Sequence, residues 1–240
     1  MNKIKKLLNK FFFLLYFKFL YKPNYEFNEV DEVAVIGRGK SANYYFEKFQ
    51  NSPKIVALVN FTDQDLKEID IQVLKSKEIF LFFNIEGNPL SLKYLLSLNI
   101  KGLMRTSNDD YGLYKKRKDY KRLNILQKLY LDRLPKYPKH LNDFMYLGNG
   151  GLISIVYMIN YFKPKRVLLF GFNFYQSKMI SNSSFSNSVN EDSTVLRKAG
   201  VKLIQNFIHI CNLFNNIEFQ RYDDTKIENV SNLKQINTGF

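Results

Sequence analysis

The stretch Val33-Ala34-Val35-Ile36-Gly37-Arg38-Gly39-Lys40-Ser41, with the helix-like segment Ala42–Gln50 behind it, decides the fold. Its four apolar residues predict a buried strand, its two glycines a turn, and the segment that follows a helix. A glycine turn lets the backbone approach an anion closely, and a helix N-terminus offers N–H groups and a partial positive charge. We therefore expect Gly37 to Ser41 to hold the phosphate of a nucleotide or of a nucleotide-activated compound.

The alternation of strand and helix continues along the chain. Apolar runs predict strands at 55–59, 79–83, 102–104, 167–170 and 217–219, and helices at 89–98, 152–162 and 195–214. Continuous apolar strands separated by helices are typical of a parallel sheet covered on both faces. The prediction is an α/β fold with a single Rossmann-like domain over residues 30–222. It has a mostly parallel sheet, helices on both faces, and a loosely ordered polar tail over residues 223–240.

The composition fits one globular domain with an anionic partner. The chain has 240 residues, of which 45% are apolar, so a sizeable core is expected. Its single cysteine, Cys211, excludes an intrachain disulfide and lies on an apolar helical stripe, where a core position is expected. The net charge of +14 favours nucleotides, anionic lipids or nucleic acids as partners.

Residues 1–22, here called the N-terminal segment, differ from the rest of the chain. Lysines surround the aromatic run Phe11–Phe17: Lys3, Lys5, Lys6, Lys10 and Lys18. The run is too short to span a bilayer, and no small-residue cleavage site follows it, which argues against a secretory signal. Phenylalanine beside lysine suits an amphipathic helix on an anionic membrane surface, with a helix packed on the domain as the alternative. We expect a cytoplasmic protein, peripheral on the inner membrane.

Polar residues follow several predicted strands at the edge where ligands bind in open parallel sheets. Asn60 and Asn84 end the second and third strands, and Gly171-Phe172-Asn173-Phe174-Tyr175 follows a later one. Neutral amides donate and accept hydrogen bonds, so they suit a pyrimidine, a ribose or phosphate oxygens. Asparagine also favours turns, which is the alternative explanation at each position.

Two further stretches carry a family resemblance. Asn149-Gly150-Gly151 opens the apolar helix at 152–162, and Gly171-Phe172-Asn173-Phe174-Tyr175-Gln176 follows the next strand. With the glycine turn and the two asparagines, this arrangement resembles the bacterial sialyltransferases of glycosyltransferase family 42, over about residues 33–220. Those enzymes move sialic acid from CMP-sialic acid onto lipooligosaccharide without a metal.

The resemblance implies a GT-A-like variant of the Rossmann fold and a CMP-activated acidic sugar as donor. It implies a glycan or glycolipid as acceptor and no metal cofactor. Tyr175 would contact the departing phosphate. The residues that would bind the donor are Gly37, Arg38, Gly39, Lys40, Ser41, Asn60, Asn84, Asn149, Gly150, Gly151, Gly171 and Asn173.

The general base is one part of the resemblance that this chain does not reproduce. The family's histidine lies after the Phe-Tyr-Gln segment, and no histidine occurs from Gln176 to Ile208. Glu191 and Asp192 are the candidate bases, although two acidic residues also suit a helix N-terminus. His140 is a further candidate for catalysis or acceptor binding.

Other functions stay open on the sequence. Asp63-Gln64-Asp65 has the spacing that holds Mg²⁺ or Mn²⁺ against the diphosphate of UDP- or GDP-sugars, but Thr62 before it suits a helix N-cap. Gly-x-Gly-x-x-Ala, completed by Ala42, fits NAD, whereas Asn60 stands where an acidic residue would hold the ribose.

A non-enzymatic function is another alternative. The basic cluster from Lys115 to Arg122, with interleaved tyrosines, could bind RNA or anionic lipid, and nucleic acid is the less favoured partner. An inactive nucleotide-binding relative of the transferases is a further alternative, and an oligomer is compatible with the sequence.

Overall fold

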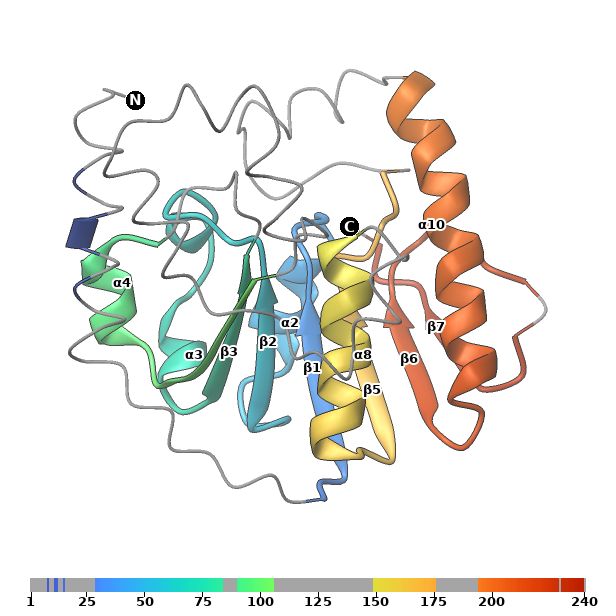
Figure 1. Ribbon diagram of the computed structural model, residues 1–240, viewed down its shortest axis with the longest axis horizontal. Coiled ribbons are helices and arrows are strands. Elements are labelled where there is room, and N and C mark those ends of the chain that lie inside the picture. The colour runs from blue at the N-terminus through green and yellow to red at the C-terminus, as the bar shows by residue number, and fades with distance from the viewer. Residues whose placement is uncertain are drawn as a thin grey trace, which may run out of the picture.

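The structure is a computed structural model that describes residues 8, 11, 12, 15, 29–83, 90–105, 149–175, 194–228 and 230–239. It contains a seven-stranded sheet (Figure 1). The strands are β1 (Glu32–Ile36), β2 (Ile55–Val59), β3 (Glu78–Phe83), β4 (Ile100–Arg105), β5 (Arg166–Phe170), β6 (Glu218–Tyr222) and β7 (Leu233–Ile236). The helices are α2 (Ala42–Lys48), η2 (Asp65–Lys67), α3 (Gln72–Lys75), α4 (Leu92–Ser97), α8 (Gly150–Phe162) and α10 (Thr194–Leu213).

All seven strands are parallel, in the order β4-β3-β2-β1-β5-β6-β7. The first strand, β1, lies in the middle of the sheet, and β2, β3 and β4 follow in order toward one edge. The chain then returns to place β5 beside β1, with Ile36 opposite Phe170, and β6 and β7 follow in order toward the other edge. The strand order therefore reverses between β1 and β5, and open parallel sheets bind ligands beyond the carboxyl ends of the strands at such a point.

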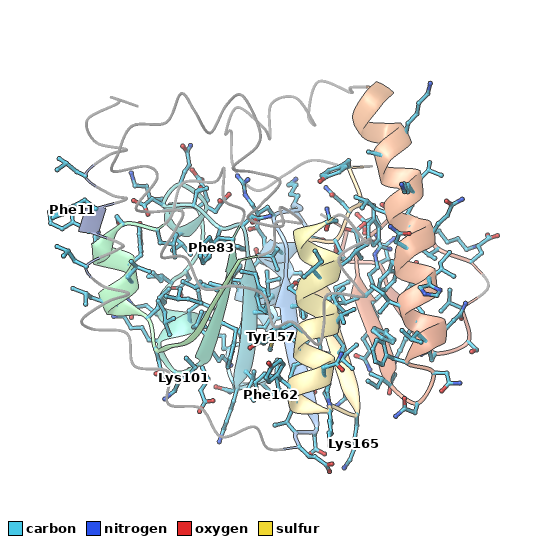
Figure 2. All side chains as sticks on the ribbon, viewed as in Figure 1. Phe11, Phe83, Lys101, Tyr157, Phe162 and Lys165 are labelled. Atoms are coloured by element: carbon cyan, nitrogen blue, oxygen red, sulfur yellow. The ribbon has the colours of Figure 1, made fainter. Side chains whose placement is uncertain are left out.

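Helices cover both faces of the sheet, as predicted. Alternate residues of β1 point to opposite faces, so Val33 packs with α8 and α10 while Ala34 packs with α2, α3 and α4. In Figure 1, α8 and α10 lie in front of the sheet and α2 lies behind it. Figure 2 shows Tyr157 and Phe162 of α8 against the sheet, where their rings contact Phe82 and Phe80 at 5.3 and 5.2 Å between centroids.

The prediction of a loosely ordered tail after residue 222 was wrong. The last predicted strand extends to Tyr222, and β7 adds a seventh strand within residues 223–240, with Phe219 opposite Leu233. Asn232 fixes the start of β7, because its Nδ2 donates to the carbonyls of Cys211, Phe214 and Ile217 at 2.9–3.1 Å. β7 is a four-residue edge strand with two polar residues, so it carries little apolar pattern.

Several predicted features lie outside the described residues, including the basic cluster from Lys115 to Arg122 and most of the N-terminal segment. Across the described parts of the chain, the helices are all too short or too polar to cross a lipid bilayer.

Cys211 is a core residue of α10, as expected, and burial raises the pKa of its thiol to about 12. The thiolate is the nucleophile that attacks iodoacetamide, so we expect almost no labelling of the native protein near neutral pH and complete labelling after unfolding. Mass spectrometry after a timed iodoacetamide pulse measures this, since the chain has no other cysteine. Rapid stoichiometric labelling of the folded protein would contradict the buried position.

Candidate functional site

The loops that follow β1 and β5 lie directly against each other at the point where the strand order reverses. The N–H of Gly37 donates to the carbonyl of Phe170 at 2.7 Å, and the N–H of Gly39 donates to that of Gly171 at 2.9 Å. A Cβ atom on Gly37 or on Gly39 would lie 2.7 Å from the Gly171 carbonyl oxygen. The glycines are therefore required because the two backbones approach so closely.

This packing differs from the phosphate cradle expected at the glycine turn. The N–H groups of Gly37 and Gly39 donate to carbonyl groups at the end of β5 and in the loop that follows it, so these two groups are already hydrogen-bonded within the protein. N–H groups in the first turn of α2 are also hydrogen-bonded within the protein: Ala42 N–H donates to Gly39 O, and Tyr44 N–H donates to Ser41 O. The glycine turn is thus a structural joint between the loops that follow β1 and β5.

A buried polar network ties this joint to the other half of the sheet. Ser41 Oγ accepts from Gly171 N–H at 3.1 Å and donates to Asp223 Oδ2 at 2.8 Å. Asp223 Oδ1 pairs with Arg221 Nη2 at 3.0 Å. The Arg221 guanidinium donates to the Phe172 carbonyl through Nε and Nη2, at 3.1 and 2.9 Å. The network therefore holds the backbone of the loop after β5.

Arg221 and Asp223 were not predicted from the sequence as part of the site. Both side chains are buried, at 0% and 3% exposure. Burial lowers the pKa of the Arg221 guanidinium, and the nearby carboxylate of Asp223 opposes this shift. Their spacing of two residues at the end of a strand, where side chains alternate, was the pattern that could have placed both on one face of the sheet.

Arg38 projects from the glycine turn into an ion pair. Its Nε lies 3.0 Å from Asp65 Oδ2, and the two side chains are 9% and 0% exposed. The same carboxylate oxygen accepts from the N–H and the Oγ1 of Thr62 at 2.7 and 2.6 Å. Asp65 N–H faces Thr62 Oγ1 at 3.4 Å in return, which is the reciprocal pattern of a capping box.

Asp63 and Asp65 serve different protein partners. Asp63 Oδ1 accepts from the N–H of Ser91 at 2.7 Å, whereas Asp65 faces Thr62 and Arg38. Within the described residues, histidine, cysteine and acidic side chains do not gather in groups of three or more that could hold a metal ion. The contacts between Thr62 and Asp65 are those that the capping explanation expects, although η2 itself begins only at Asp65.

Asn60 adopts a left-handed backbone conformation, with φ 57°, immediately after β2. Its N–H donates to the carbonyl of Phe82 at 2.7 Å and so continues the pairing of β2 with β3. Asparagine tolerates this conformation better than other residues with a side chain. The turn explanation therefore accounts for the residue type at this position. Asn84 lies outside the described residues.

The start of α8 and the loop after β5 bring Asn149 and Tyr175 together. Asn149 caps the helix, because its Oδ1 accepts from the N–H groups of Gly151 and Leu152 at 2.9 and 3.3 Å. Its Nδ2 donates to Tyr175 Oη at 3.4 Å. Asn173 shapes the loop, since its Oδ1 accepts from Tyr175 N–H at 3.1 Å. Gly150 is the first residue of this helix.

The backbone around Tyr175 is unusual. Phe174 and Tyr175 are consecutive non-glycine residues with positive φ, at 48° and 61°, three residues after Gly171 at 70°. Such conformations cost about 1–3 kcal/mol each and often mark functional sites. Burial raises the pKa of the Tyr175 hydroxyl, although the hydrogen bond from Asn149 opposes this. The hydroxyl is therefore protonated near neutral pH and can donate a hydrogen bond.

The structure thus brings together much of the predicted donor site. The glycine turn, Gly171–Tyr175 and Asn149–Gly151 meet at the carboxyl edge of the sheet, and Lys40 is exposed beside them in the turn. The candidate bases Glu191, Asp192 and His140 lie outside the described residues. Comparisons with protein-family models, with curated proteins and with solved structures found no match.

Proposed function

We propose that the protein is a glycosyltransferase that moves an acidic sugar, sialic acid or a related nonulosonic acid, from a CMP-activated donor onto a glycan or glycolipid. The observation that carries the proposal is the Asn149–Tyr175 contact at the start of α8, beside the reversal of strand order between β1 and β5. There, one amide and one protonated hydroxyl converge at the place where open parallel sheets bind nucleotides.

The proposed reaction is a single displacement at the anomeric carbon of the donor sugar. The acceptor oxygen forms a bond to that carbon while the bond from the carbon to the phosphate oxygen breaks, and CMP leaves. Tyr175 donates a hydrogen bond to the phosphate of the leaving group, which stabilises the charge that develops there. A carboxylate of Glu191 or Asp192, or the imidazole of His140, takes the proton of the acceptor hydroxyl.

Metal-independent donor binding is part of the proposal. A CMP-sugar carries one phosphate, so it needs less charge neutralisation than the diphosphate of a UDP- or GDP-sugar. The carboxylate of Asp65 is already paired with Arg38 inside the protein, which leaves the Asp63-Gln64-Asp65 triplet poorly arranged for a shared cation.

Calorimetric titration with CMP, UDP, GDP and NAD, with and without Mn²⁺, tests the proposal. We expect CMP to bind without metal, and Tyr175→Phe to weaken it about tenfold, because a hydrogen bond to a charged phosphate is lost. Tyr161→Phe is the matched control: it removes the same hydroxyl from a tyrosine near the end of α8 that is opposite to Asn149. The Tyr161→Phe variant should bind CMP with the same affinity as the wild type.

Other outcomes would overturn the proposal in distinct ways. Metal-dependent binding of UDP or GDP would move the donor site to Asp63 and Asp65. CMP binding with no transfer from any CMP-sugar would identify an inactive relative. Absence of binding to all four nucleotides would reject a transferase of this kind.

A further inference from the structure

One side of the N-terminal segment carries a concentrated apolar surface. Leu8, Phe11, Phe12 and Leu15 are helical, and their exposed fractions are 48%, 43%, 39% and 37%. Residues spaced by three, four and seven share one face of a helix, so these side chains form one stripe, here called the apolar stripe. Figure 2 shows Phe11 at the outer edge of the molecule.

This concentration is unusual within the described residues. The other large apolar side chains that are exposed there are Leu96 on α4 and Val201 and Leu213 on α10. Leu96 is the one exposed apolar side chain among those described on α4, and twelve positions separate Val201 from Leu213. Scattered exposed apolar residues are normal on protein surfaces, whereas a contiguous stripe indicates a surface that another body covers.

The positive charge of the same segment indicates which kind of partner covers the stripe. Lys3, Lys5, Lys6, Lys10 and Lys18 lie within residues 1–22, which contain no acidic residue. Two copies of this segment packed together would combine only positive side-chain charges, which disfavours a dimer through the stripe. An anionic lipid surface instead neutralises the lysines and accepts the phenylalanine and leucine side chains at the level of its headgroups.

We propose that the apolar stripe is a docking surface for anionic phospholipid bilayers, with its phenylalanine rings inserted at the interface. Phe11 and Phe12 form its centre, where their rings lie 5.8 Å apart edge to face. The attachment is peripheral and reversible, because it combines a short apolar stripe with salt-sensitive attraction. It does not depend on the proposed transferase activity.

Vesicle co-sedimentation of the full chain tests this docking. The wild type should bind vesicles that contain about 30% phosphatidylglycerol, and salt or pure phosphatidylcholine vesicles should weaken binding. The double variant Phe11→Ser/Phe12→Ser should bind at least about tenfold more weakly, since two rings no longer insert. The control Val201→Ser/Leu213→Ser removes two apolar side chains from α10 that are more exposed than Phe11 and Phe12, and it should bind like the wild type.

Two further measurements distinguish a loss of vesicle binding from a loss of folding or of nucleotide binding. All four substituted side chains are exposed, so the thermal midpoints of both variants should match the wild type. Any nucleotide binding measured for the wild type should persist in the Phe11/Phe12 variant. Failure of the wild type to bind the anionic vesicles, or full binding by the Phe11/Phe12 variant, would overturn the proposal. A wild-type dimer that this variant converts to a monomer, without vesicle binding, would assign the stripe to a second copy of the chain.

Discussion

Replacing Asp223 with alanine is expected to lower the free energy of unfolding by about 3–5 kcal/mol, because it leaves a buried guanidinium without its counter-ion. The side chain of Arg221 has no exposed surface, and Asp223 is its acidic partner at 3.0 Å. The substitution also removes the acceptor of the Ser41 hydroxyl, 2.8 Å away, and that of the N–H of Thr225, 3.0 Å away.

Urea unfolding followed by circular dichroism measures this loss. Asp223→Asn should fall between alanine and the wild type, since it keeps an acceptor oxygen but loses the charge. Asp31→Ala is the matched control, because Asp31 also forms an ion pair, with Lys165 at 2.8 Å, but both side chains are more than 80% exposed. It should unfold at nearly the wild-type urea concentration. If Asp223→Ala did the same, the buried pair would not support the fold.

The central strands were predictable from the sequence because both of their faces are buried. Val33 and Val35 face one core, and Ala34 and Ile36 face the other, so the whole run is apolar. The edge strand β7 lacked this pattern because its side chains are only partly buried or exposed. Its place depends on pairing with β6 and on Asn232, and neither has a signature in the local sequence.

The candidate site was predictable in position but not in the way its groups are used. Strand ends and glycine turns placed Gly37 and Gly171 at the same edge of the sheet. In the close contact between the two loops, however, the N–H groups of Gly37 and Gly39 donate to backbone carbonyls, whereas they were expected to bind phosphate. Arg38 pairs with Asp65, 27 positions away in the chain, and Ser41 bonds to Asp223, 182 positions away. Such contacts follow from the assembled fold and not from local periodicity.

Substitution of Gly171 by alanine tests whether the joint between the two loops shapes the site. Gly171 has φ +70°, and a Cβ there would lie 2.6 Å from the carbonyl oxygen of Gly37 and 2.9 Å from the N atom of Gly39. Both atoms are backbone, so no side chain can move aside. We expect a loss of about 3 kcal/mol or more in unfolding free energy, from the left-handed conformation together with the steric overlap.

Gly239 provides the matched control for this substitution. It has nearly the same φ, +71°, but nothing lies within 4 Å of a Cβ built there. Gly239→Ala should therefore cost only about 1 kcal/mol, for the backbone conformation alone. The difference between the two alanine variants in urea unfolding measures the steric part.

The same pair of variants connects the joint to ligand binding. Alanine at position 171 must push apart the loops after β1 and β5, and the second of these loops carries Tyr175 only four residues further on. If CMP binds at this edge, Gly171→Ala should lose CMP affinity under conditions where it remains folded, and Gly239→Ala should retain it. Equal CMP affinity in the two variants, with Gly171→Ala destabilised as expected, would mean that the joint supports the sheet but does not position Tyr175 for a nucleotide.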